Sequence, residues 1–552
     1  MKKIAELWVF LNKKSIAPSL VTGSRRWLIR IMRGYRFLKE TNQLDLISSV
    51  KNEITNVRFH GIDHNVSKFF FGAGISQAEL ITRQYLLMRF CSIGFNNALL
   101  HSLGSKDCPV VYPMPKLWQQ VVAKNGFRVA KIRCSLMWVL YAGLFWCYGV
   151  LSILKYLCAS LSKIIRPQAF TLGRYAYFVG LTAGNLPQPC RDGRSHDIFT
   201  WYVNWNGKTE RLNALCHGVI NTKECDVGGL PVMFNSHQLP LIVNLGGLAR
   251  FISWAFVAIL HSIFDLFFGR WWHAMLLAEF AKSAIVRFQP TDKLARDYMF
   301  NNSGWIYRPL WTYEAEKKGS RIVFYFYSTH CESFKRPNGY PIQAKSWQVV
   351  SWPLYLVWDK YQADFVRRAV NQAANIEIVG PVWFQSSSVE IPKLPVGSVA
   401  VFDVQPHRNS LYQTFGLDSY KEFYVPKTCN QFLLDIYSVV GECKRAMVHK
   451  RKRNTGLMLH PQYENLINFL MKADNVFPIE PDISAIRVIE NCFAVISMPF
   501  TSTALLGREL GKPSIYYDPH GAVQKDDRAA HGIMVLSGKD ELREWLLSLK
   551  AK

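Results

Sequence analysis

Acidic residues are scarce in this chain of 552 residues, which holds 40 Asp and Glu against 66 Lys and Arg. The resulting formal charge of +26 requires an anionic partner: nucleic acid, phospholipid headgroups or phosphorylated substrates. Charged residues make up only 19% of the chain and aromatic residues 14%, a composition that excludes a disordered protein. The length allows roughly two to four folded domains.

Paired cysteines are also missing. The 12 cysteines form no CxxC pair and no Cys/His spacing typical of a zinc site, so we expect buried thiols in a reducing compartment. No signal peptide is predicted, because Lys13 and Lys14 interrupt the apolar stretch that follows the basic start. No nucleic-acid-binding module accompanies the basic surplus, and the aromatic residues cluster in apolar runs, so nucleic acid is not expected as a partner.

Two segments are apolar enough to contact lipid. Residues 135–154 contain no charge and have basic residues on both flanks, which suits a membrane helix beside anionic headgroups. Residues 251–269 are less apolar, because they include His261 and Asp265. The alternative for both segments is a helix buried in a protein core.

Strand-like and helix-like runs divide the chain into four parts. Residues 1–106 are mostly helical in pattern and carry no motif. Residues 107–385 predict an N-terminal Rossmann-like domain into which the two apolar segments are inserted, and residues 386–397 form a polar linker. The runs expected to be strands of this domain are 109–115, 127–132, 175–183, 197–205, 239–247, 321–329, 347–359 and 376–384.

Residues 398–552 have the most regular pattern and predict a doubly wound parallel sheet. Two such domains leave a cleft between them. The expected strands are 399–406, 446–450, 476–480, 492–499 and 513–519, and the expected helices are 430–442, 463–473, 484–490, 502–510 and 539–549.

A Ser/Thr-rich segment follows the strand 492–499 and opens a helix. A helix N-terminus with free N–H groups can bind phosphate, and the hydroxyls of Thr501, Ser502 and Thr503 would add donors there. Ordinary helix capping is the alternative.

His460 and Pro461 are expected at a neighbouring strand end. A histidine there can donate a hydrogen bond to a phosphate or carry a proton to it, although a surface turn is the alternative. Lys450 and Lys452 belong to the densest basic run of the chain. They could neutralise phosphate charge or form a solvated loop.

This layout of a basic strand end, His-Pro, an acidic-Pro loop and a Ser/Thr-rich helix start resembles the C-terminal half of GT-B glycosyltransferases. It is most similar to enzymes that use CMP-activated acidic sugars, the bacterial sialyltransferases and Kdo transferases. In that group an HP motif and a Ser/Thr motif hold the nucleotide phosphate; His460 matches the first, and Ser502 with Thr503 the second. The acidic D/E-D/E-G motif that supplies the base in some sialyltransferases is absent.

The stretch VISMPFTSTALLGRELGKPSIYYDP (495–519) also resembles the family of polysaccharide biosynthesis proteins named for its PFTS motif. The sequences of residues 307–320 and 324–335 also resemble this family, so the likeness covers most of 107–552. It implies two facing Rossmann-like domains with the nucleotide sugar bound by the second.

A direct inverting transfer needs a general base, usually Asp or Glu, which in this architecture comes from the N-terminal domain. Asp226 precedes two glycines, while His330 and Glu332 follow the strand 321–329. Glu314 is a further candidate and has Glu316 beside it. A surface carboxylate is the alternative for each, and a solvated charge cluster with the following lysines is the alternative for the last two.

Three acids in the C-terminal domain are candidates for contacts with the nucleoside. Glu480 or Asp482 could bind ribose hydroxyls or cytosine, the alternative being a turn that caps the next helix. Glu509 lies on the helix after PFTST, where many GT-B enzymes bind ribose with an acid, and simple surface exposure is the alternative.

These features predict a GT-B glycosyltransferase that moves a sugar from a nucleotide donor to a surface polysaccharide or lipid-linked acceptor. The resemblance to sialyltransferases and Kdo transferases implies that the donor is a CMP-activated acidic sugar. No metal or resident cofactor is expected, because helix N-termini and His, Ser and Thr side chains can carry the phosphate charge. The alternatives are a CDP-polyol phosphotransferase and a non-catalytic polysaccharide-assembly protein with a vestigial transferase fold.

The expected location is the cytoplasmic face of the bacterial inner membrane. Residues 167–250 contain runs expected in the first sheet, and a bilayer cannot divide a sheet. We therefore expect both apolar segments to enter the leaflet as re-entrant or in-plane helices, bound also by anionic lipid. His261 and Asp265 favour a shallow position for the second segment, because a charge at the membrane centre is costly.

Overall fold

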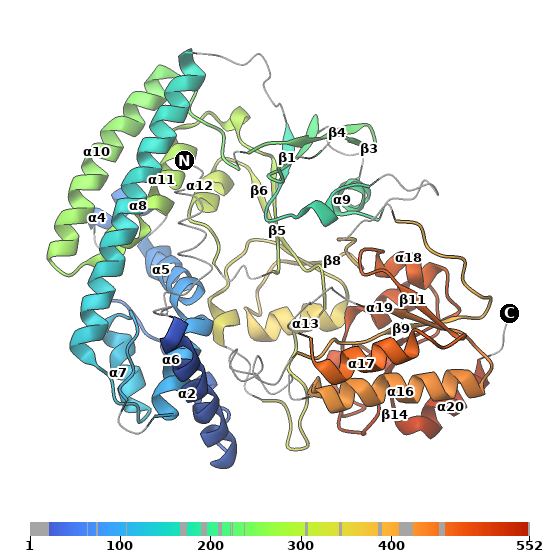
Figure 1. Ribbon diagram of the computed structural model, residues 1–552. Helices are drawn as coiled ribbons and strands as arrows, with labels where there is room; N and C mark the ends of the chain where they lie inside the picture. Colours follow the sequence, from blue (N-terminus) through green and yellow to red (C-terminus); the bar gives the residue numbers. More distant parts are fainter. Residues whose placement is uncertain are drawn as a thin grey trace.

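The computed structural model of the chain contains two mostly parallel β-sheets with helices around them and a helical region beside the first sheet (Figure 1). The expected fold class, α/β with two Rossmann-like sheets, is confirmed. The structure describes residues 21–62, 65–72, 75–105, 108–165, 174–188, 196–207, 212–220, 222, 225–236, 238–303, 307–329, 331–341, 345–384, 389–407, 423–451 and 459–549.

The second sheet has the strand order β11-β10-β9-β12-β13-β14, and every neighbouring pair is parallel. The order reverses between β9 and β12, so a crevice is expected at their carboxyl ends. Continuous apolar runs form these strands because helices cover both faces. The strands are β9 (Val399–Phe402), β10 (Met447–Lys450), β11 (Val476–Ile479), β12 (Ala494–Ser497), β13 (Ser514–Asp518) and β14 (Met534–Ser537).

The helices of this domain follow the sequence prediction within a few residues, apart from an earlier start of the first one. Each has an apolar stripe that packs on the sheet. The helices are α16 (Pro426–Glu442), α17 (Pro461–Leu470), α18 (Ala485–Glu490), α19 (Ser502–Glu509) and α20 (Gly538–Ser548), with the 3-10 turn η5 (Arg528–Ala530) before β14.

The first sheet has the order β3-β4-β2-β1-β5-β6-β7-β8. All neighbours are parallel except β3, which forms an antiparallel hairpin with β4 at the sheet edge. If β3 is left out of the count, the strand order reverses direction between β1 and β5, as it does between β9 and β12 in the second sheet. The strands are β1 (Tyr175–Phe178), β2 (Ala214–His217), β3 (Cys225–Val227), β4 (Leu230–Phe234), β5 (Asp297–Asn301), β6 (Arg321–Tyr325), β7 (Tyr355–Val357) and β8 (Ile376–Ile378).

The helices beside this sheet come from its crossovers. The connection after β1 carries the 3-10 turn η1 (Ala183–Asn185) and α9 (Ile198–Asn206), and α12 (Trp311–Lys317) precedes β6. The 3-10 turn η3 (Lys345–Val349) precedes β7, and α13 (Lys360–Ala369) follows it. The turn η2 (Thr291–Lys293) precedes β5.

Several strand predictions in this half were wrong. Residues 197–205 form α9, because the carboxylate of Asp197 caps the helix by accepting from the N–H groups of Phe199 and Thr200 at 2.8 and 2.9 Å. Residues 239–247 contain no strand. The runs 109–115 and 127–132 meet only in an isolated bridge between Val110 and Val129, so the first sheet begins at Tyr175. The strands β2, β3, β4 and β5 were not predicted, and neither was β14 of the second sheet.

The helical region consists of segments before and after β1 to β4. The longest helix, α8, packs closely on α11: a Cβ atom at Gly149 would lie 2.5 Å from Cβ of Leu277. The helices are α2 (Val21–Glu40), α3 (Leu46–Thr55), α4 (Asn65–Phe71), α5 (Ile75–Phe90), α6 (Ile93–Leu103), α7 (Lys116–Lys124), α8 (Lys131–Ile165), α10 (Leu245–Phe267) and α11 (Trp271–Phe288).

By length and composition alone, α8 and α10 could cross a membrane. They lie side by side at one flank of the molecule (Figure 1), joined by the hydrogen bond from Trp146 Nε1 to Ser262 Oγ at 3.0 Å, with α11 packed against both. The side that each helix turns away from the protein is apolar. We call this surface the outer apolar face; it consists of Ile132, Leu136, Leu140, Leu144, Leu151, Leu154, Leu161 and Ile165 on α8 and Leu245, Ile252, Phe256, Leu260, Phe264 and Phe267 on α10.

One argument for a shallow position of α10 does not hold. Asp265 points into the protein, where it is 4% exposed and its Oδ2 pairs with Nδ1 of His273 at 2.5 Å. Of the two residues that favoured a shallow position, His261 and Asp265, only His261 is exposed. The charge of Asp265 therefore says nothing about the depth of the helix in a membrane.

The segments before α8 contact the connections between strands of the first sheet. Gln84 on α5 donates from Nε2 to Ser351 Oγ at 2.8 Å, and Asp45 pairs with Arg336 at 3.3 Å. Ser351 and Arg336 follow α10, so these contacts do not bear on whether α8 and α10 cross a bilayer. The relevant contact is the parallel pairing of β1 with β5, because β1 lies between the two apolar helices in the sequence and β5 follows α10.

The two domains also pack against each other. One hydrophobic cluster contains Phe324 and Val357 of the first sheet together with Leu505 and Tyr516 of the second domain. Polar contacts reinforce it at both ends of α19: Ser502 contacts Thr329, and Arg508 contacts Asp359 at 3.5 Å. α19 therefore forms a central part of the domain interface.

Candidate functional site

The candidate site lies at the carboxyl edge of the second sheet, where β9 has β10 on one side and β12 on the other. The next residue after β9 is Asp403, and the loop after β12 carries the PFTST sequence. This loop is held at the end of β9 by the hydrogen bond from Met498 N to Phe402 O at 2.8 Å. Two helix starts, those of α17 and α19, therefore flank the end of β9.

The start of α19 depends on a tight turn. Phe500 has a φ of 63°, a left-handed conformation that is rare for a bulky residue and is often associated with functional sites. The turn leads into Thr501, whose Oγ1 donates to Met498 O at 2.9 Å. Thr503 turns back toward the sheet, with its Oγ1 2.8 Å from Ser497 Oγ. Of the three predicted hydroxyls, Thr501 and Thr503 thus stabilise the loop.

Ser502 has a different environment. Its Oγ accepts from Thr329 N at 3.1 Å and lies at the same distance from Thr329 Oγ1. Thr329 belongs to the segment after β6 of the first sheet. Ser502 therefore stands where the carboxyl end of a strand of one sheet meets the carboxyl edge of the other.

The start of α17 is tied to the end of β9. His460 is the N-cap residue, Pro461 is the first helical residue, and His460 N donates to Pro406 O at 3.0 Å. Tyr463, in the first turn, donates its hydroxyl hydrogen to Asp403 Oδ2. These contacts position the His-Pro motif beside the β9 end, at the same sheet edge as Ser502.

Lys450 ends β10 at this edge, and its Nζ donates to Pro481 O at 3.1 Å. This bond holds the loop that carries Glu480 and Asp482, both exposed. Ser484, not Asp482, caps the next helix. Lys452 lies outside the described residues.

Glu332 is the base candidate that the structure brings to the domain interface. It is 9% exposed; its Oε2 pairs with Arg368 of α13, and its Oε1 lies 3.3 Å from Nη2 of Arg528 in the second domain. Burial raises the pKa of Glu332, and the two arginine charges offset this only in part. His330 lies outside the described residues.

The structure places the other acids elsewhere, which corrects the expectation of a common cleft. Asp226 is exposed at the amino ends of the parallel strands, where its Oδ1 accepts from Gly229 N at 2.8 Å. Glu314 pairs with Arg287 at 3.3 Å in the helical region, and Glu316 pairs with Arg308. Glu509 is the last residue of α19, about 10 Å along the helix from Ser502 at 1.5 Å per residue.

Sequence reasoning missed two buried polar residues at the site. Asp403 is 4% exposed and lies 3.4 Å from Nε2 of His449, which is 3% exposed on β10. Oδ1 of Asp403 has no hydrogen-bond partner among the described residues. The signal was available, because Asp403 directly follows the strand run VAVF, and a position at a strand end was the criterion for His460, Ser502 and Glu332. Within the described part of the chain, no group of three or more His, Cys, Asp or Glu could hold a metal ion.

Comparison with known proteins adds a family. No curated protein matches the chain at a significant level. The chain has a weak structural likeness to UDP-GlcNAc 2-epimerase from Methanocaldococcus jannaschii, with 8% identity, a TM-score of 0.35, and coverage of 69% of this chain and 94% of that one. The glycosyltransferase SnogD from Streptomyces nogalater has 12% identity and a TM-score of 0.30, and the match covers 68% of this chain and 94% of that one.

The family comparison is independent of these likenesses. The family model for polysaccharide biosynthesis PFTS motif proteins matches residues 258–546, slightly more than half of the chain. The matched range includes α11, the strands β5 to β14, both flanking helices of the candidate site and the PFTS sequence itself. The chain therefore belongs to the family of polysaccharide biosynthesis PFTS motif proteins.

Proposed function

We propose that the chain is a glycosyltransferase of the GT-B type that transfers a sugar from a nucleotide donor to a surface polysaccharide or a lipid-linked acceptor. The proposed donor is a CMP-activated acidic sugar, and the proposed location is the cytoplasmic face of the bacterial inner membrane.

The observation that carries this proposal is the meeting of two helix starts at the reversal point of the second sheet. Each presents backbone N–H groups, which favour an anion. His460 and Ser502 add side-chain donors, and Lys450 adds a positive charge nearby. A nucleotide phosphate fits this chemistry without a metal ion.

Glu332 is the proposed general base, in preference to Asp226 and Glu314. A raised pKa brings a carboxylate closer to the range in which it takes up a proton efficiently. Both of its oxygens are paired with arginines, so the acceptor hydroxyl must displace Arg368 or Arg528 before proton transfer. We therefore expect the domains to separate slightly when substrates bind.

The proposed membrane contact is the outer apolar face. Its stripe on α8 runs from Ile132 to Ile165, about 50 Å of helix, whereas the hydrocarbon core of a bilayer is about 30 Å thick. A stripe of that length suits a helix that lies in the membrane plane. The parallel pairing of β1, which lies between the two apolar helices in the sequence, with β5, which follows them, favours the same orientation, because a bilayer cannot divide one sheet.

Thermal unfolding with added nucleotides tests the donor. CMP should raise the melting temperature of the full chain more than UDP or GDP, and the shift should shrink in Ser502→Ala and His460→Ala. A larger shift with CDP would favour the phosphotransferase alternative. Absence of a shift with every nucleotide would refute the donor site and favour a non-catalytic assembly protein.

Turnover of the same variants tests the phosphate contacts. Loss of one donor to a charged oxygen costs roughly 1.5–3 kcal/mol, so each variant should lose at least about 10-fold in rate. Ser438→Ala is the matched control, because its hydroxyl donates to Glu442 on the same helix at 2.9 Å, away from the candidate site. Thr329→Val separates a structural role of Ser502 from a role in phosphate binding. It removes the contact between the Thr329 and Ser502 hydroxyls but leaves the hydrogen bond from Thr329 N to Ser502 Oγ. Wild-type turnover in Ser502→Ala would remove that residue from the site.

Cysteine labelling tests the location. Ile220 is 71% exposed in the connection between β2 and β3. A cysteine at this position, on a background without native thiols, should react with an impermeant reagent only after the cells are opened. Labelling of intact cells would contradict the cytoplasmic location.

A further inference from the structure

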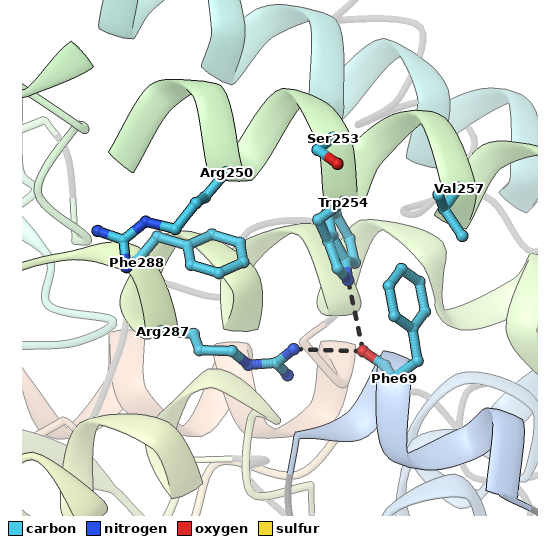
Figure 2. A pocket seen from close by; sticks show the side chains of 7 residues that line it. All are labelled: Phe69, Arg250, Ser253, Trp254, Val257, Arg287 and Phe288. Carbon is cyan, nitrogen blue, oxygen red and sulfur yellow. Dashed lines mark hydrogen bonds between the residues drawn. The ribbon is translucent and has the colours of Figure 1, made fainter. Parts of the chain in front are cut away.

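A pocket of about 320 Å³ opens between α4, α10 and α11, far along the chain from the candidate nucleotide site. Figure 2 shows its walls: the rings of Phe69, Trp254 and Phe288 and the side chain of Val257, with Arg250 and Arg287 at one side. An open, apolar groove with two guanidinium groups beside it suits an amphiphile that carries one anionic group.

The pocket borders the outer apolar face. Ser253 and Val257 line it from α10, and both are exposed on the same helix that presents Phe256 and Leu260 outward. A chain that leaves the pocket past Val257 therefore continues on apolar surface. This continuity favours an occupant that comes from the membrane.

The two arginines differ in their freedom. Arg287 is fixed: its Nε contacts Glu314 at 3.3 Å, and its Nη1 donates to Phe69 O at 3.2 Å (Figure 2). Arg250 is exposed. Its Nε donates to Gly246 O of its own helix at 3.3 Å, and its guanidinium lies 6.0 Å from the centre of the Phe288 ring. Arg250 can therefore reorient toward a ligand while Arg287 gives the site a fixed charge.

Positive charge exceeds negative charge around the pocket. Lys318 follows α12 close by, and burial lowers its pKa; Glu314 opposes this, while the charge of Arg250 adds to it. Glu314 is already paired with Arg287, and Glu316 with Arg308. An anion at the pocket would relieve the repulsion among these cations.

We propose that this pocket binds the phosphate group and the upper acyl chain of an anionic phospholipid of the membrane leaflet. The proposal rests on the membrane location given under the proposed function and adds a specific lipid contact to it. Arg250 and Arg287 hold the phosphate, and Phe69, Trp254 and Val257 contact the chain. The bound lipid would fix which side of α10 faces the membrane. It would thereby set the orientation of the cleft between the two domains relative to the membrane surface.

Sedimentation of the full chain with lipid vesicles tests the proposal. Phosphatidylcholine vesicles measure binding by the outer apolar face, and the gain on adding phosphatidylglycerol measures the anionic contribution. Arg250→Gln should reduce this gain about 5-fold, the usual effect of one arginine near an anionic surface. Lys472→Gln, an exposed lysine on the second domain, is the control for charge and should leave the gain unchanged.

A second variant separates the pocket from general surface charge. Ser253→Trp fills the pocket and leaves every charge in place, so it should also lose most of the gain while binding phosphatidylcholine vesicles like the wild type. Ser162→Trp, at an exposed position on α8, is its control. An unchanged gain in Ser253→Trp, or no gain in the wild type, would overturn the lipid pocket. Failure of the wild type to bind any vesicle would overturn the membrane location as well, while the nucleotide test would stand.

Discussion

The two sheets have the same order of parallel strands, but the connection between the third and the fourth parallel strand differs greatly in length. Between β11 and β12 the chain makes only α18, a helix of 6 residues. At the corresponding position of the first sheet, between β4 and β5, it makes α10 and α11, of 23 and 18 residues. The compact crossover adds only this short helix to the second domain. The expanded crossover gives the first domain its apolar flank, so one topology supports two different contacts.

The buried carboxylates of the two sheets differ in a similar way. Asp297 on β5 receives both Nε and Nη2 of Arg321, at 3.0 and 2.6 Å, and is fully neutralised. Asp403, after β9, contacts Tyr463 and His449 and keeps one oxygen without a partner among the described residues. Asp297 is therefore suited to stability, and Asp403 to a site that a ligand completes.

The largest expected effect comes from charging the outer apolar face. Phe256→Glu with Phe264→Glu removes two rings that are 66% and 59% exposed. Each ring contributes roughly 2 kcal/mol of burial in lipid, so vesicle binding should weaken by two to three orders of magnitude. Phe469→Glu with Leu547→Glu, two exposed apolar residues of the second domain, should change vesicle binding little. Similar losses in both pairs would mean that the first domain has no special apolar surface.

The next effect concerns stability. Asp297→Asn leaves the charge of Arg321 without its partner, and breaking such a buried pair costs about 3 kcal/mol in the free energy of unfolding. Chemical denaturation followed by tryptophan fluorescence measures the loss. A loss below about 1 kcal/mol would show that water, which reaches the 34% exposed side chain of Arg321, already screens the pair.

Asp403→Asn gives the counterpart in the second sheet. It removes no strong ion pair, so the free energy of unfolding should fall by only about 1 kcal/mol. Turnover and nucleotide binding should suffer more than stability. If Asp403→Asn destabilises the chain as much as Asp297→Asn and leaves turnover intact, the proposed difference between the two carboxylates is wrong.

The smallest effect tests the domain interface. Oδ2 of Asp359 lies 2.8 Å from Nδ1 of His531, and its Oδ1 caps α13 by accepting from Gln362 N. Burial alone would raise the pKa of Asp359, but the hydrogen bond and charge of His531 outweigh it, so the pKa is lowered. A lowered carboxyl pKa contributes stability above the unfolded value of about 3.9, and this contribution is lost as the pH falls through the folded value.

Asp359→Asn keeps the helix cap, because Asn caps as well as Asp, and removes only the charge. We expect a loss of about 1 kcal/mol in the free energy of unfolding near neutral pH that shrinks below about pH 4. Unfolding curves of wild type and variant across that range measure it. A difference that is constant with pH would exclude the ion pair as its cause.

Sequence patterns predicted the second domain far better than the first. Most of its strands are short apolar runs with Pro, Asp or Gly at one end or both, and each helix between them has one apolar stripe. In the first domain both signals fail: the aromatic run 197–205 has enough bulk for a strand, but the cap at Asp197 makes it a helix. Of the candidate site, strand ends predicted His460 and Ser502 at one sheet edge, and the same rule applied to VAVF would have added Asp403.

The sequence by itself determined the local signals: the helix start at PFTST, the two apolar segments and most strand ends of the second domain. These are set by neighbours within a few residues, through capping, turn conformation and periodicity. Only the tertiary structure decided that Glu332 faces Arg528 across the domain interface, that Asp226 lies at the opposite edge of its sheet, and that Asp265 points inward. Such outcomes depend on which distant elements pack together, and no local pattern encodes that.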